Sequence, residues 1–163
     1  MSDFAHLHVH SEYSLLDGLS KIKKLVQQAK IMGMKHIAIT DHGSMYGAIK
    51  FYQICKEEGI NPIIGCEMYI APRSHTDKES TNGDKDYSHL TVLAKDYEGY
   101  KNLMKLVTIS HLEGFYYRPR IDKEILTKHS KGLMAVSGCV SSEISKLFIQ
   151  DDVKGAEEKI KEC

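Results

Sequence analysis

Several features that would assign a chain to a class at once are missing from this sequence. Its 163 residues carry 22 basic and 22 acidic side chains, so no net charge draws it toward nucleic acid or a membrane. No apolar stretch is long enough to span a bilayer, and the start, MSDFAHLHVH, lacks the basic and apolar regions of a secretory signal. We therefore expect no membrane partner, and any contact with nucleic acid must be local.

The sequence contains few cysteines, and their spacing does not indicate a framework of disulfide bonds. The four cysteines are Cys55, Cys66, Cys139 and Cys163, and no two form a C-x-x-C pair. This pattern disfavours a disulfide scaffold or a structural zinc site made of thiolates, and it predicts a reducing, cytoplasmic compartment. A chain of this length is most simply one domain, residues 1–163, with a sizeable core.

Strand-like and helix-like segments alternate along the chain. Apolar residues at helical spacing predict helices in SKIKKLVQQAKIMG and SMYGAIKFYQICKEEG. Residues 73–86 have almost no apolar content and are predicted to be a mobile surface loop. The alternation predicts an α/β fold with parallel strands. The five predicted strands are HLHVH, KHIAIT, IIGCEMYIA, SHLTVLA and KGLMAVSG.

The first predicted strand carries His6, His8 and His10 at alternate positions. Successive side chains of a strand point to opposite faces, so these three imidazoles would share one face. A soluble strand needs no such row for its stability. The row therefore directs attention to metal binding.

Potential ligands recur where the predicted strands begin or end, which is where functional groups gather in parallel α/β folds. Each has an ordinary explanation when taken alone. An H-x-H pair is often exposed or hydrogen-bonded, TDHG can be a turn in which Asp41 accepts backbone bonds, and Cys139 can be a small buried group. Taken together they favour a cluster of metal ions. The candidates are His8, His10, Asp41, His42, Glu67, His89 and Cys139.

The mixture of imidazole and carboxylate limits the chemistry of such a cluster. Neutral imidazole binds borderline divalent ions, and a carboxylate can bridge two of them. Zinc, manganese or iron suits this ligand set. Two ions about 3.5–4 Å apart activate a water molecule and stabilise a phosphate leaving oxygen. The ligand types thus predict a phosphoesterase site.

The motifs HVHSEYSLLDG, ITDHG and GCEMYIA resemble the polymerase and histidinol phosphatase (PHP) domain. Two further blocks, HLTVLAKDYEGYKNLMKLVTISHLEGFYYRPRID and AVSGCVSSEI, are similar to the amino-terminal end of bacterial DNA polymerase III α subunits, the C-family replicative polymerases. The resemblance implies an irregular (β/α)7 barrel of PHP type, truncated here to about five strands. It also implies that the domain is incomplete at its C-terminal end, that the polymerase domains lie outside this chain, and that the family's last Asp-x-His motif is absent.

The resemblance also implies roles for individual residues. Asp17 occupies the position of a further metal ligand, Glu67 that of a bridging carboxylate, and Asp41 that of a ligand or of a group that fixes an imidazole. His6 matches no ligand, and we expect it to be an interior hydrogen-bonding group. The implied metal ligands are His8, His10, Asp17, His42, Glu67, His89 and Cys139, and the first five of them are also the implied catalytic residues. They would hold two or three ions in the complete domain, zinc or manganese, with iron as a further candidate.

Arg118 and Arg120 in YYRPRID are candidates for holding a phosphate, because a guanidinium donates two parallel bonds. The alternative is that they are surface charges that steady a loop around Pro119.

The resemblance implies a metal-dependent 3′–5′ exonuclease that proofreads within the polymerase. Its partners would be the remainder of the α subunit, the holoenzyme and the 3′ end of DNA. Two alternatives stay open. The metals could only hold the domain folded as a scaffold for the polymerase, or the chain could be a stand-alone small-molecule phosphatase such as histidinol phosphatase.

Overall fold

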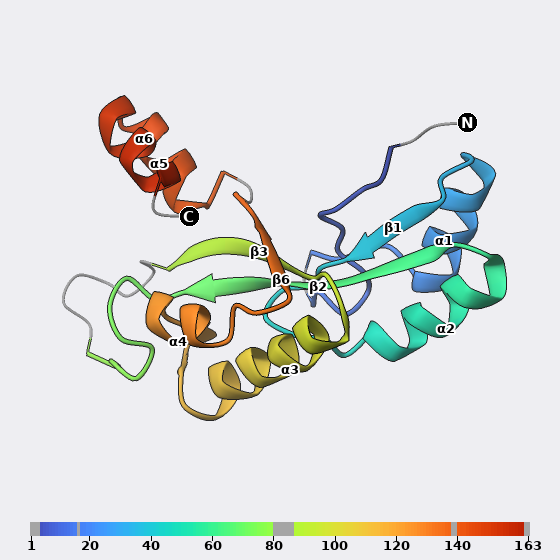
Figure 1. Ribbon diagram of the computed structural model, residues 1–163, viewed down its shortest axis with the longest axis horizontal. Coiled ribbons are helices and arrows are strands. Elements are labelled where there is room, and N and C mark those ends of the chain that lie inside the picture. The colour runs from blue at the N-terminus through green and yellow to red at the C-terminus, as the bar shows by residue number, and fades with distance from the viewer. Residues whose placement is uncertain (1–3, 16, 80–86, 138–139, 162–163) are drawn as a thin grey trace.

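The computed structural model describes residues 4–15, 17–79, 87–137 and 140–161, and Figure 1 shows their arrangement. Helices and strands alternate along much of this part of the chain, so the expected α/β class is confirmed. None of the helices within the described ranges is long and apolar enough to cross a membrane. The helices are α1 (Ile22–Ile31), α2 (Ala48–Glu58), α3 (Tyr97–Leu112), α4 (Lys123–Lys128), α5 (Glu143–Ile149) and α6 (Val153–Lys161), and the strands are β1 (His36–Ile39), β2 (Asn61–Ile70), β3 (Ser88–Ala94), β4 (Phe115–Tyr116), β5 (Arg118–Ile121) and β6 (Leu133–Val136).

The sheet is built around the long strand β2 and is mixed, so the expectation of parallel pairing throughout is wrong. The first half of β2 pairs in parallel with β1, and its second half runs antiparallel to β3 and touches β5 in parallel. Strand β6 is antiparallel to β3, and β4 is antiparallel to β5. Parallel neighbours need a long crossover, usually a helix. Residues 71–79 and 87, the described part of the connection from β2 to β3, contain no helix, and the chain returns antiparallel.

The expected first strand is an extended segment rather than a regular strand. It lies beside β1, where Ala38 N donates to His6 O at 2.9 Å and Thr40 N donates to Val9 O at 2.8 Å. The backbone bends at His8. Because of this bend the alternation is interrupted, and His6 is exposed, with its ring edge-on to Phe4 at 4.8 Å. The expectation that His6 is an interior group is therefore wrong.

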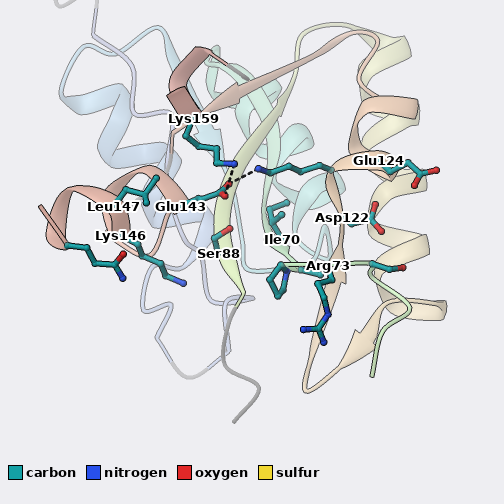
Figure 2. A pocket seen from close by; sticks show the side chains of 14 residues that line it. Ile70, Arg73, Ser88, Asp122, Glu124, Glu143, Lys146, Leu147 and Lys159 are labelled. Carbon is teal, nitrogen blue, oxygen red and sulfur yellow. Dashed lines mark ion pairs between the residues drawn. The ribbon is translucent and has the colours of Figure 1, made fainter. Parts of the chain in front are cut away.

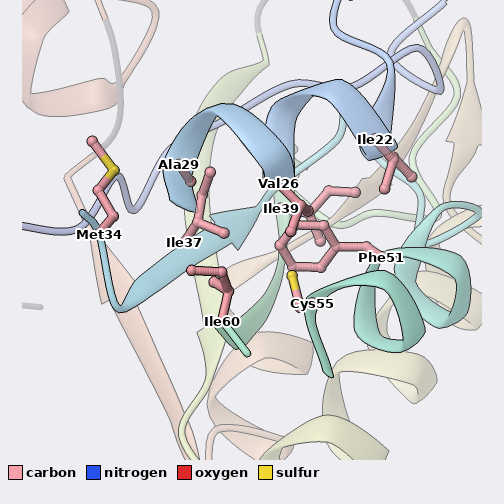
Figure 3. Packing of buried hydrophobic residues seen from close by; sticks show 9 residues of the cluster. All are labelled: Ile22, Val26, Ala29, Met34, Ile37, Ile39, Phe51, Cys55 and Ile60. Carbon is pink, nitrogen blue, oxygen red and sulfur yellow. The ribbon is translucent and has the colours of Figure 1, made fainter. Parts of the chain in front are cut away.

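Buried apolar side chains form two clusters, one on each half of the sheet. The first packs α1 and α2 against β1, with Val26, Ile39 and Phe51 among its members (Figure 3). The second packs α3 against β2 and β3, and Ile64 on β2 contacts both clusters. Cys66, Met68 and Ile70 point into the second cluster. Since side chains alternate along a strand, Glu67 and Tyr69 face the other side of the sheet.

The described part of the predicted loop, residues 73–79, is anchored rather than loose. His75 is buried, and both its backbone N and its ring Nδ1 contact Asp122 Oδ2, at 2.9 and 2.5 Å. Arg73 pairs with Asp77 at 2.7 Å. Residues 80–86 lie outside the described ranges, so the prediction of mobility there stays a prediction.

Candidate metal centre

The carboxylate of Glu67 lies at the centre of four imidazoles. It is only 1% exposed, and each of its oxygens faces two rings. Oε1 is 3.1 Å from His8 Nε2 and 3.3 Å from His89 Nδ1. Oε2 is 3.4 Å from His10 Nε2 and 2.5 Å from His42 Nδ1. Four segments that are distant in sequence thus meet at one carboxylate.

Strand pairing brings these side chains together. Beyond the end of β1, the chain continues beside β2 through a parallel bridge between His42 and Glu67. Glu67 N donates to Asp41 O at 3.1 Å, and Gly43 N donates to Glu67 O at 2.9 Å. On the other side of β2, the register pairs Tyr69 with His89, so His89 is a diagonal neighbour of Glu67 on the same face.

A hydrogen-bonded serine, Ser14, links Asp41 to the imidazole of His10. Asp41 is buried, and it accepts hydrogen bonds from Ser11 N at 2.6 Å, Ser11 Oγ at 2.7 Å and Ser14 Oγ at 2.7 Å. Because Ser14 donates its only hydrogen to Asp41, it accepts from His10 Nδ1 at 2.9 Å. This arrangement leaves the lone pair of His10 Nε2 pointing toward Glu67, which is the tautomer that a metal ligand needs. The sequence analysis missed both serines.

Asp17 lies at the edge of this group. The Asp17 side chain is 61% exposed, and its Oδ2 lies 2.9 Å from His42 Nε2, the ring nitrogen that faces away from Glu67. The structure therefore places Asp17 at the rim of the centre. Cys139 lies outside the described residues, and its expected role stays a prediction.

Two groups of ligand atoms could each hold a divalent ion. One consists of His8, His10 and Glu67, and the other of His42, Glu67 and His89, with the atoms in each group within 4.8 Å of one another. His42 Nδ1 is buried and is 2.5 Å from Glu67 Oε2, but within the described part of the chain no acceptor meets it at a hydrogen-bonding angle. Converging nitrogens around a shared carboxylate fit two ions with a bridging ligand.

The ionisation of these groups follows from their contacts. Burial opposes the ionisation of Glu67, but the imidazoles of His42, His8 and His89 together lower the pKa of its carboxyl. Burial, reinforced by the nearby His42, lowers the pKa of His10 and favours its neutral form. The contact with Glu67 raises the pKa of His42, against the effect of its burial. Since ligation needs a neutral imidazole, a proton and a metal ion compete at His42.

Two tyrosines form an aromatic wall behind the imidazoles. Tyr69 is buried, and its ring centroid lies 6.0 Å from that of His42 and 5.0 Å from that of His89. Burial raises the pKa of Tyr69 to about 12. The Tyr87 ring stacks on His89 at 5.8 Å and 4°. Sequence reasoning missed both residues, although Tyr69 follows Glu67 by two positions and so lies on the same face.

The two candidate arginines differ in position. Arg118 is exposed, its guanidinium lies 5.8 Å from the Tyr69 ring, and a hydrogen bond with Tyr87 raises its pKa. Arg120 is buried and donates to three backbone carbonyl oxygens, of which Asp77 O is the nearest at 2.7 Å. The structure thus brings Arg118 to the centre, whereas Arg120 steadies residues 73–79.

A cleft of about 680 Å³ lies beside the centre, between α5, α6 and the end of β2 (Figure 2). Lys123 and Lys159 project into it and pair with Glu143 at 2.8 and 3.1 Å. Ser88, which precedes His89, lines the cleft, but none of the candidate ligands within the described ranges does. The candidate metal centre is therefore a separate feature.

The chain is similar to known proteins over most of its length. It is 48% identical over 155 residues to DNA polymerase III subunit alpha of Treponema pallidum, covering 95% of this chain and 13% of that protein. It is 52% identical over 159 residues to the same subunit of Borreliella burgdorferi, covering 98% and 14%. The chain thus spans only a small part of these relatives.

Among solved structures, an amidohydrolase from Chromobacterium violaceum aligns with a TM-score of 0.47 and 19% identity, covering 68% of this chain and 34% of that one. The family model of the PHP domain matches residues 6–163. The chain therefore belongs to the PHP domain family.

Proposed function

We propose that this domain is a metal-dependent phosphoesterase that trims the 3′ end of DNA within the α subunit of bacterial DNA polymerase III. The observation that carries the proposal is the arrangement around Glu67. One buried carboxylate presents each of its oxygens to two imidazoles and belongs to both potential metal groups. The converging imidazoles supply the nitrogen ligands that two divalent ions bridged by a carboxylate would use.

The residues that would hold the metal follow from the two groups. His8, His10 and Glu67 would hold one ion, and His42, Glu67 and His89 the other. Zinc and manganese suit this ligand set, and iron is a further candidate. Divalent ions bound there activate a water molecule and neutralise charge on the leaving oxygen of a phosphodiester. A third ion would require ligands beyond these groups, such as Asp17 or Cys139.

The remaining side chains position the substrate and the ligands. The exposed guanidinium of Arg118, held by Tyr87 and Tyr69, can donate two bonds to the non-bridging oxygens of a phosphate. Asp41 keeps the metal-facing nitrogen of His10 unprotonated through Ser14. Tyr69 covers the inner side of His42 and His89, where it keeps water away from the rings.

The similarity to polymerase α subunits supports the biological setting. We propose the remainder of the α subunit, its holoenzyme and the 3′ end of DNA as partners, and the cytoplasm as the location. The match extends over 155 residues of the Treponema relative. A stand-alone small-molecule phosphatase is less consistent with so long a match to a polymerase subunit.

The test compares variants of the full-length polymerase subunit. His10→Ala and Glu67→Gln should lose trimming of a 3′-labelled single-stranded oligonucleotide and should bind less metal, while primer extension continues. His36→Ala, at an exposed position of β1, is the matched control.

Two results would overturn the proposal. The first is an unaltered protein that, loaded with zinc, manganese or iron, trims no DNA. The second is a pair of site variants that lose primer extension and resistance to urea together with trimming, which would identify the centre as a scaffold.

A further inference from the structure

The hairpin of β4 and β5 turns at a single strained residue. The register pairs Phe115 with Pro119 and Tyr116 with Arg118, which leaves Tyr117 alone at the tip. Its φ is +57°, in the left-handed region that glycine and asparagine adopt most readily. A tyrosine at this position is therefore a conformational cost that a glycine would avoid.

The surroundings of Tyr117 do not offset this cost by burial. The residue is 70% exposed, and its ring meets the Tyr116 ring edge-on at 4.6 Å. Tyr116 in turn packs on the guanidinium of the buried Arg120 at 5.1 Å. The ring of Tyr117 at the tip of the hairpin is thus exposed to solvent, while the contact between Tyr116 and Arg120 holds the base of the hairpin. Strain retained at an exposed side chain points to a function for that side chain.

The hairpin also lies against the metal centre. Arg118, the next residue, reaches the aromatic wall formed by Tyr69 and Tyr87. On the other side of the hairpin, an added Cβ on Gly43 would come within 2.7 Å of Pro119 Cγ, so β5 packs on the turn that carries His42. Tyr117 directly precedes Arg118 in the hairpin, so the two side chains start from Cα atoms about 3.8 Å apart.

Further aromatic side chains extend from the same place. His111 Nε2 donates to Gly43 O at 2.8 Å, and its ring is flanked by Tyr46 and Phe115 at 6.5 and 6.4 Å. Both flanking side chains are largely exposed. Exposed aromatic rings next to a cation are the features that bind single-stranded nucleic acid, because every base offers a π-face.

We propose that Tyr117 stacks on a nucleobase of single-stranded DNA next to the phosphate that Arg118 binds. This inference rests on the proposed function, since it names how the substrate of that site is held. Stacking tolerates every base, so the hairpin would hold a frayed 3′ end without selecting its sequence. A duplex would keep its bases stacked on each other and would leave Tyr117 without a partner.

The test uses the full-length polymerase subunit in the presence of a chelator, so that no hydrolysis is needed. A single strand with 5-iodouracil near its 3′ end is photocross-linked, and the attached peptide is identified by mass spectrometry. We expect attachment at Tyr117. In Tyr117→Gly, half-saturation of cross-linking to the hairpin peptide should require about tenfold more DNA, whereas Tyr97→Ala, which alters an exposed tyrosine on α3, should leave attachment at Tyr117 unchanged.

The stability of the protein is a second, independent measurement: the substitution that weakens DNA binding should make the fold more stable. Tyr117→Gly should raise the urea midpoint, because relief of the left-handed strain outweighs the extra backbone entropy that glycine gives the unfolded chain. A lower midpoint would show that Tyr117 is structural and would overturn the inference, as would the absence of cross-links at Tyr117. Trimming without such cross-links would sink this inference alone. Cross-links at Tyr117 in a protein that never trims DNA would sink the phosphoesterase proposal instead.

Discussion

An ionised carboxylate is costly to bury, because it loses its hydration. Glu67 is fully enclosed, and the imidazoles of His42, His8 and His89 offset that cost by lowering its pKa. The same nitrogens would turn their lone pairs toward a divalent ion once they are neutral. At the scale of single residues, Glu67 is therefore the position on which both ligand groups depend.

Asp41→Asn is expected to weaken metal binding without removing a ligand. An amide oxygen can still accept from Ser11 N and Ser14 Oγ, but its charge is lost and the amide NH₂ faces Ser11 Oγ, so the bond that orients Ser14 toward His10 is weaker. Loss of such support lowers metal affinity by about 10–100-fold. Calorimetric titration with zinc or manganese measures the change. Asp151→Asn, at an exposed position, is the control, and equal affinities of the two variants would contradict the prediction.

The candidate ligands could be chosen from the sequence because their residue types are unusual at strand ends. His8, His10, His42, Glu67 and His89 do come together, while their roles as ligands stay predictions. Ser14 and Tyr69 escaped notice because hydroxyl and aromatic side chains are common along any chain. Their importance depends on which atoms they meet, and that is known only when distant strands are paired.

At the scale of elements, the periodicity of apolar residues predicted where helices lie, but it did not predict the direction of the strands. On α1, Ile22 and Val26 are buried as helical spacing indicates, but on α2 the buried residues include Phe51 beside Ala48 and Cys55, whereas Ile49 and Tyr52 are exposed. The antiparallel direction of β3 was not predicted, because alternation of side chains is the same in both directions. Direction depends on the connection between strands, and the loop predicted at residues 73–86, with no helix to cross over, was the signal for an antiparallel return that the strand patterns alone do not give.

Asp122 joins two elements, and we expect its substitution to loosen both. It caps α4 by accepting from Ile125 N at 2.9 Å, and it accepts from His75 in the segment that follows β2. In Asp122→Asn the amide oxygen can still cap α4, but its NH₂ group faces the His75 donors. An unsatisfied buried donor costs about 1–3 kcal/mol, which urea unfolding at neutral pH would measure. Asp152→Asn, which changes an exposed cap at Gly155, is the control and should change stability less.

The same carboxylate makes stability depend on pH. Burial opposes its ionisation, but the hydrogen bonds from Ile125 and His75 lower the pKa of Asp122. A depressed folded pKa contributes stability above the ordinary carboxyl pKa of about 3.9. That contribution is lost as pH falls from there through the lower folded value. The difference in stability between the native chain and Asp122→Asn should therefore shrink below about pH 4, and a constant difference would contradict this account.

At the scale of the whole molecule, the candidate centre joins segments that the core does not hold equally. The two apolar clusters secure α1, α2, α3 and the main strands, while residues 4–11 contact them mainly through Val9. His8 and His10 belong to that segment. Metal bound around Glu67 would therefore tie the start of the chain to β2 and β3.

Removal of metal should lower the stability of the protein. A ligand that binds only the folded state adds about 2.7 kcal/mol when its concentration is 100 times its dissociation constant. A chelator should accordingly lower the urea midpoint of the metal-loaded protein. Glu67→Gln, which alters both groups, should show a much smaller response. An equal response in both proteins would place the stabilising metal elsewhere.

The sequence by itself determined the properties that depend on residues close together in the chain. Side-chain periodicity identified α1, α2 and α3 and most extended segments, but not α4 or the β4–β5 hairpin, and ligand chemistry selected the histidines and acids, because each depends on residues close in the chain. Only the tertiary structure decided that His89 lies diagonal to Glu67 across antiparallel strands, that Ser14 connects Asp41 to His10, and that Tyr117 is held at a strained turn. Strand register and burial arise from contacts between distant segments, and no local pattern specifies which of them will meet.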